Sequence, residues 1–116
     1  MTATWNTDLI ECVGTTLGGK MQAIGAHILW PLAVSMHRSQ PAGRDLECYS
    51  EDPFLTGRMA IAYIDGLQGQ GVGAGIKHSV CNDSKFEQRT LSSQVSERAL
   101  REIYLSVSFP NGHPPG

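Results

Sequence analysis

Residues 38–57, which read RSQPAGRDLECYSEDPFLTG, decide the fold of this 116-residue chain. The segment joins an apolar run to a helical one, and it contains a Pro-Ala-Gly turn, an arginine, several acids and a Ser-Glu-Asp-Pro helix start. A charged, irregular segment between two apolar ones is a typical place for a binding edge. Residues 76–78, Ile-Lys-His, belong with it, and we interpret the rest of the chain as the scaffold that holds the two segments side by side.

Two apolar segments predict the strands. Residues 27–36, HILWPLAVSM, form a nearly continuous apolar run, which favours a strand covered on both faces, as in a parallel sheet. Pro31 has no amide hydrogen to donate to a strand ladder, so we expect a break or a bulge at that point. Residues 72–77, VGAGIK, predict a second short buried strand.

Residues 6–24 predict the first helix. Asn6 or Thr7 can cap it, and Gly25 supplies a left-handed stop. Three glycines within it each cost about 1 kcal/mol relative to alanine, so the helix needs a packing partner. Its apolar face recurs at helical spacing and consists of Leu9, Ile10, Val13, Leu17, Met21 and Ile24.

Two further helices follow. Asp52 caps the second, and Pro53 occupies its first position. The third contains residues 95–105, VSERALREIYL, and is expected to start at Ser92 or Ser93. The resulting order, α-β-α-β-α, predicts an α/β fold built from right-handed βα units on a parallel sheet.

The length fits one domain or part of a larger one. Residues 1–105 are expected to form a single folded unit. The remaining residues, 106–116, read SVSFPNGHPPG, and their proline and glycine content predicts a disordered tail.

Composition excludes several classes of protein. The net charge of −2 favours neither nucleic acid nor an anionic membrane as partner. No apolar run approaches the roughly 20 residues that span a bilayer, and no signal peptide is visible at the N-terminus. The three cysteines, Cys12, Cys48 and Cys81, are widely spaced without a CxxC pair, which favours reduced, partly buried thiols over a zinc site. No metal ion and no cofactor are predicted.

Two loops are expected at the C-terminal ends of the strands, where α/β folds bind ligands. The first carries Arg44 and Glu47, and the second starts at Lys77 and His78. Cations beside carboxylates suit a polyhydroxylated ligand, because a sugar hydroxyl both donates and accepts hydrogen bonds. Adjacent strand residues point to opposite faces, so Lys77 and His78 reach one ligand only if the strand ends there.

Each of these residues also has a purely structural interpretation. Arg44 can form an ion pair with Glu47 or Asp52, and Asp52 is better explained as a helix cap than as a catalytic acid. Lys77 can be a surface lysine and His78 a capped histidine. Glu47 is more easily explained as a residue that orients an arginine than as a catalytic carboxylate.

Three segments in order, GRDLECYSEDPFLTG, GVGAGIKHSVCND and SERALREIYL, resemble the N-terminal barrel of glycoside hydrolase family 3, the β-glucosidase-like enzymes. The resemblance covers residues 3–105 and is closest to fungal enzymes, whose full-length forms are expected to be secreted. It implies a partial (β/α) barrel of TIM type with about two to three βα units and parallel strands. It also implies that Arg44, Lys77 and His78 bind hydroxyls of the sugar in the −1 subsite.

The resemblance implies a retaining enzyme that hydrolyses terminal β-D-glucosyl residues with two carboxyl groups. The family's nucleophile lies in a downstream Ser-Asp-Trp-like segment and its acid/base residue in a later domain, so no catalytic residue is expected here. The sequence also departs from the family pattern at Lys85 and Gln88, where the family has Glu and Arg.

A complete barrel of eight βα units needs about 250 residues, so these strands cannot close. We therefore expect a fragment that is inactive alone, that packs poorly or associates through its open sheet edges, and that needs the remaining barrel and the C-terminal domain. The alternative is a non-catalytic remnant that at most binds sugar or associates with a full-length homologue.

Overall fold

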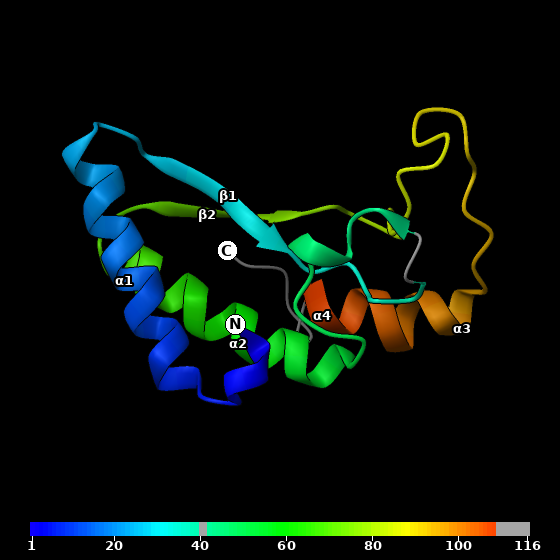
Figure 1. Ribbon diagram of the computed structural model, residues 1–116, viewed down its shortest axis with the longest axis horizontal. Helices are drawn as coiled ribbons and strands as arrows, with labels where there is room; N and C mark the ends of the chain where they lie inside the picture. The colour runs from blue at the N-terminus through cyan, green and yellow to red at the C-terminus, as the bar shows by residue number, and fades with distance from the viewer. Residues whose placement is uncertain (40–41, 109–116) are drawn as a thin grey trace.

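The computed structural model describes residues 1–39 and 42–108, and it shows a small parallel sheet with helices gathered on one side of it (Figure 1). The predicted order of helices and strands is confirmed. The elements are η1 (Thr2–Thr4), α1 (Thr7–Ala23), β1 (Ile28–Ala33), η3 (Asp45–Glu47), α2 (Pro53–Gln68), β2 (Gly73–Lys77), α3 (Glu97–Ala99), η4 (Leu100–Leu105) and α4 (Ser106–Ser108).

Strands β1 and β2 pair in parallel, and they are the two strands of the sheet within the described part of the chain. Ile28 lies opposite Gly73 and Ala33 opposite Lys77, with an irregularity in register between Leu29 and Leu32. That irregularity includes position 31, where the missing amide hydrogen of proline predicts one. Strand β1 is shorter than the expected 27–36, although residues 34–36 continue it as buried chain.

The expectation that the first strand is covered on both faces is wrong. The residues Ile28 and Trp30 are 63% and 69% exposed. The indole of Trp30 lies directly over Gly75 of β2, where a Cβ atom would collide with the ring. Leu32 and Ile76 belong to the opposite, helix-covered side. The sheet therefore has one buried face and one bare face.

Helices α1 and α2 cross closely because two glycines meet the facing backbone. A Cβ atom on Gly14 would collide with the carbonyl oxygen of Tyr63, and one on Gly66 with that of Glu11. The glycines of α1 thus mark its packing partner. Around this crossing the core consists of Ile10, Leu32, Val34, Met36, Tyr49, Met59, Ala60, Ala62, Tyr63, Leu67, Val72, Tyr104 and Val107.

Two residues assigned to the apolar face of the first helix lie outside it. Leu9 is 47% exposed and Ile24 is 73% exposed. Leu9 lies in the first turn of α1, and Ile24 lies just past its last helical residue. No helix in the described part of the chain is long and apolar enough to cross a membrane.

The predicted helix caps of α1 and α2 are confirmed. Asn6 Oδ1 accepts a hydrogen bond from the Leu9 amide at 3.0 Å, and Asp52 Oδ1 accepts one from the Phe54 amide at 2.8 Å. Gly25 has φ of +75°, the left-handed value expected of a helix stop. The local sequence therefore explains both helix caps and the helix stop.

The start of the final helix differs from the expectation. Its cap is Ser96, whose Oγ accepts a hydrogen bond from the Ala99 amide at 3.2 Å, not Ser92 or Ser93. The helix continues to Ser108, three residues into the segment expected to be a disordered tail. Residues 109–116 of that segment lie outside the described residues.

The close helix crossing gives the first prediction. Gly66→Ala should lower the free energy of unfolding by about 1–3 kcal/mol, because the new methyl group meets backbone that cannot move aside cheaply. The measurement is the urea midpoint of the far-UV circular dichroism signal.

Gly19→Ala is the matched control, because a Cβ atom at this helical position has no neighbour within 4 Å. It should stabilise α1 by about 0.5–1 kcal/mol. Equal midpoints for Gly66→Ala and the unmodified chain would contradict the packing described.

Candidate functional site

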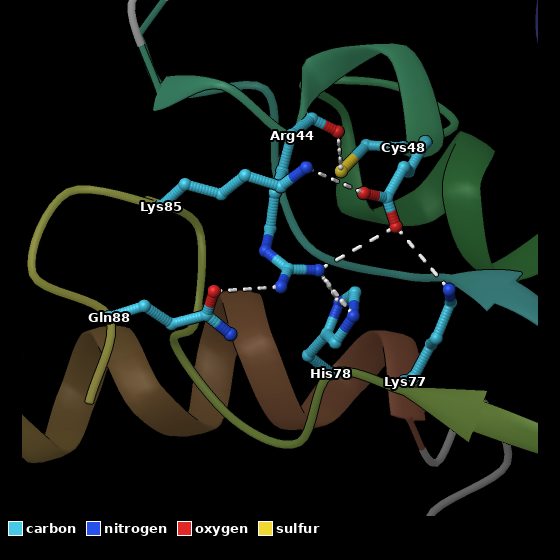
Figure 2. A network of polar contacts seen from close by, with 7 residues as sticks. Arg44, Cys48, Lys77, His78, Lys85 and Gln88 are labelled. Carbon is cyan, nitrogen blue, oxygen red and sulfur yellow. Dashed lines mark hydrogen bonds and ion pairs between the residues drawn. The ribbon is translucent and has the colours of Figure 1, made fainter.

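The three residues singled out from the sequence come together where the two strands end. Strand β2 ends at Lys77, so the chain turns there and His78 reaches the same side as Lys77 (Figure 2). Arg44 arrives from the loop after β1, just before η3. A bridge between Ala33 and Cys48 fixes this loop beside the end of β1. These loops lie at the C-terminal edge of a parallel sheet, as expected for a ligand site.

Local hydrogen bonds hold the loop in place. Gly43, with φ of +79°, turns the chain into Arg44. The Nε2–H of His37 donates to the carbonyl oxygen of Asp45 at 2.7 Å, and the Lys85 amide donates to the carbonyl oxygen of Ala42 at 2.8 Å. The second bond brings the loop after β2 against the loop after β1.

Arg44 is the buried centre of the site, with 8% of its surface exposed. Its Nη2–H donates to Gln88 Oε1 at 3.0 Å, and its Nη1 lies 3.6 Å from Glu47 Oε2. The same Nη1 contacts the ring of His78. Its Nε is buried without a hydrogen-bond partner among the described residues. The guanidinium is thus held in one orientation by three neighbours.

Glu47 lies among three cations. Its Oε2 is 3.3 Å from Lys77 Nζ and its Oε1 is 3.6 Å from Lys85 Nζ, in addition to the contact with Arg44. Burial alone would raise the pKa of Glu47. The hydrogen bond and charge of Lys77, with the charges of Arg44 and Lys85, outweigh burial and lower that pKa. The carboxylate therefore stays ionised and orients the cations.

The His78 ring favours its neutral form at neutral pH. Burial lowers its pKa, and the charges of Arg44 and Lys77 lower it further. Arg44 Nη1 lies 2.5 Å from His78 Nε2 and 3.3 Å from Nδ1. We assign Nε2 as the acceptor and Nδ1 as the nitrogen that carries the proton. That N–H is available to a ligand.

The expected ion pair between Arg44 and Glu47 is thus confirmed, and Asp52 serves as a helix cap. Sequence reasoning placed Lys85 in the second loop but did not assign Gln88 to the site. Both arrive because the loop after β2 folds back on Ala42, a path that no local sequence pattern specifies.

A second polar network lies nearby and was not predicted. Arg38 Nη1–H donates to Tyr104 Oη at 2.6 Å, and Tyr104 Oη donates to Asp83 Oδ2 at 2.8 Å. Burial, followed by the hydrogen bond to Asp83, raises the pKa of Tyr104 to about 12. A cavity of about 530 Å³ adjoins Arg38, Asp83 and Phe86. The network ties the final helix to both loops.

The cysteines and acids form no metal site within residues 1–39 and 42–108. All three cysteines are free thiols, and Cys12 is exposed although a partly buried thiol was expected. Burial raises the pKa of Cys48 to about 11, which makes that thiol a poor nucleophile at neutral pH.

The model of the family described as "Glycosyl hydrolase family 3 N terminal domain" matches residues 1–110. The chain belongs to glycosyl hydrolase family 3. A β-glucosidase of Rhizobium radiobacter is 55% identical over 103 residues, which cover 89% of this chain and 13% of that protein. The chain thus spans about one eighth of the length of this curated relative.

Solved structures of β-glucosidases superpose on this chain. β-Glucosidase 3B of Thermotoga neapolitana in complex with glucose superposes with a TM-score of 0.89 and 43% identity, over 93% of this chain and 16% of that one. The GH3 β-glucosidase of Bifidobacterium adolescentis gives 0.91 and 31%, over 97% and 17%. The chain therefore has the fold of part of a TIM-type α/β barrel and spans about one sixth of these relatives.

The position of Glu47 gives a prediction for acid stability. Glu47→Gln should lower the free energy of unfolding at neutral pH by about 1–2 kcal/mol, because three cations then face one another without their shared anion. A lowered pKa means that Glu47 stabilises the fold above its unfolded pKa, near 4.3, and that this contribution is lost as the pH falls through the folded pKa.

Urea unfolding at neutral and acidic pH measures both effects. The difference in the free energy of unfolding between the unmodified chain and Glu47→Gln should become smaller at acidic pH. Glu51→Gln, at an exposed position, is the control and should leave stability unchanged at both pH values. A difference in unfolding free energy that becomes larger at acidic pH would contradict the stabilising role assigned to ionised Glu47.

Proposed function

We propose that this chain forms the sugar-binding edge of a β-glucosidase-type family 3 enzyme that hydrolyses terminal β-D-glucosyl residues. Arg44, Lys77 and His78 would bind hydroxyl groups of the terminal sugar in the −1 subsite. The observation that carries the proposal is the convergence of these three side chains at the ends of two adjacent parallel strands. The β-glucosidase names of the relatives, and the glucose bound to the Thermotoga neapolitana structure, support it.

The geometry suits positioning of the sugar. Lys77 Nζ keeps donors free beyond its contact with Glu47, and the Nδ1–H assigned to His78 would supply a further donor. Arg44 contacts the His78 ring and orients it, and Arg44 itself donates a hydrogen bond to Gln88. Donors fixed in advance orient the sugar and stabilise charge that develops during reaction, at little reorganisation cost.

The bond-breaking groups would come from elsewhere in a larger assembly. Retaining glycosidases use two carboxyl groups about 5–5.5 Å apart, one of them with a raised pKa so that it can protonate the leaving oxygen. Glu47 has the opposite property, because its neighbours lower its pKa. We therefore propose that the 116-residue chain alone does not hydrolyse glycosides and requires the remaining barrel and a C-terminal domain.

A second candidate function is a non-catalytic remnant that binds sugar or associates with a full-length homologue. The bare face of the sheet favours it, since Ile28 and Trp30 are exposed there and the two strands keep open edges. Sharp, dispersed amide resonances and a cooperative thermal unfolding transition for the isolated chain would contradict the interpretation that it is a poorly packed fragment of a barrel.

Two measurements on the purified chain test the proposal. It should release no chromophore from a chromogenic β-glucoside. Glucose titrated into the ¹⁵N-labelled chain should shift the amide resonances around Lys77 and His78, with a dissociation constant in the millimolar range or weaker, about −4 kcal/mol or less favourable.

Arg44→Ala should abolish these shifts, whereas Arg58→Ala, at an exposed position on α2, should preserve them. Turnover by the chain that Arg44→Ala removes would overturn the claim of inactivity. Glucose shifts that survive Arg44→Ala would overturn the assigned site.

A further inference from the structure

The hydroxyl group of Tyr104 connects the two loops that carry the sugar-binding edge. It accepts a hydrogen bond from Arg38 Nη1 at 2.6 Å and donates one to Asp83 Oδ2 at 2.8 Å. Arg38 lies in the loop after β1, which also carries Arg44. Asp83 lies in the loop after β2, which starts at His78. Tyr104 itself belongs to the final helix, which runs beside both loops (Figure 1).

Tyr104 is a firmly anchored member of this network. It is 6% exposed and belongs to the hydrophobic core. Burial raises the pKa of its hydroxyl to about 12, so the group keeps its proton at neutral pH and remains a donor to Asp83. A donor on a core residue defines one position for the carboxylate that accepts from it.

The carboxylate of Asp83 depends on this donor. Its side chain is 11% exposed, and its Oδ1 is buried without a hydrogen-bond partner among the described residues. Arg38 Nη1 is 4.0 Å away on a side chain that is 62% exposed, and such a pair contributes little. A buried carboxylate that loses its hydrogen bond is costly. Loss of the Tyr104 hydroxyl would therefore favour a loop conformation that hydrates Asp83.

A shift of Asp83 would disturb the sugar-binding edge. The Lys85 amide donates to the carbonyl oxygen of Ala42 at 2.8 Å, and Lys85 Nζ lies 3.6 Å from Glu47 Oε1. These contacts hold the loop after β2 against the loop after β1. Residues 85–94 are exposed, so this part of the loop can move away without opening the core. Such a movement would change how His78 lies relative to the first loop.

We propose that Tyr104 is a positioning residue for sugar binding. Its hydroxyl couples the loop after β2 to the loop after β1 through Asp83, and it thereby sets the affinity of the edge for a terminal glucosyl residue. Tyr104 acts through Asp83 and not by contact with the sugar. The inference rests on the proposed function, because it concerns the affinity of the same edge.

Tyr104→Phe tests the coupling, because it removes the hydroxyl and keeps the ring. In the ¹⁵N-labelled 116-residue chain, the Lys85 amide should exchange with solvent deuterium about tenfold faster, since its bond to Ala42 opens more often. The Val34 amide, which donates to the carbonyl oxygen of Lys77 at 2.8 Å, is the internal reference for opening of the sheet.

Glucose titration of the same samples tests the effect on binding. The dissociation constant obtained from the amide shifts of Lys77 and His78 should rise about fivefold or more in Tyr104→Phe. Urea unfolding establishes that each variant is folded under the conditions of the titration. A role in global stability alone would leave the dissociation constant of the folded chain unchanged.

Further variants test the route through Asp83. Asp83→Asn keeps an oxygen that can accept from Tyr104 and should retain most of the affinity. Asp83→Ala should reproduce the loss seen in Tyr104→Phe, and the double variant should lose no more than either single one. Tyr63→Phe, which removes the hydroxyl of a buried tyrosine on α2, is the matched control and should leave the affinity unchanged.

The outcomes separate this inference from the proposed function. Glucose affinity that survives Tyr104→Phe would overturn the inference and leave the proposed sugar site standing. Losses that add in the double variant would overturn the route through Asp83. If the unmodified chain binds no glucose, the proposed function fails, and unchanged exchange of the Lys85 amide in Tyr104→Phe would overturn the coupling of the loops as well.

Discussion

Glu47 makes the contacts on which the arrangement of the site depends. Arg44 comes from the loop after β1 and Lys77 is the last residue of β2, and both approach the same carboxylate oxygen. Lys85 approaches the other oxygen from within the loop after β2. Without a shared anion these cations would repel one another, and Arg44 would be a buried charge with a histidine and an amide as its polar neighbours. Glu47 therefore couples the two loops electrostatically.

The helices bring those loops within reach. Because Gly14 and Gly66 have no side chains, α1 and α2 approach through backbone contacts, and α2 then packs against β2. This fixes one face of the sheet, while Trp30 and Ile28 lie bare on the other. A barrel of the TIM type fills that inner face with side chains from all its strands. The exposed face and the small share of the relatives that the chain spans are thus consistent with each other.

Local patterns were sufficient to predict the elements. The caps at Asn6 and Asp52 and the turn at Gly25 each depend on neighbours a few residues away. Contacts between distant segments were harder to predict. The burial of only one sheet face depends on which elements pack where, and the entry of Gln88 into the site depends on how a long loop folds back. Ser92, Ser93 and Ser96 all suit a helix cap, and the sequence alone did not distinguish them.

The most direct test of the central claim is to locate bound sugar relative to the cluster around Glu47. Uniformly ¹³C-labelled glucose added to the chain allows intermolecular nuclear Overhauser effects to be observed between sugar protons and individual side chains. The account predicts such effects to the His78 ring and to the Lys77 side chain. Effects confined to Phe86 and Val95, which line the neighbouring cavity, would contradict it.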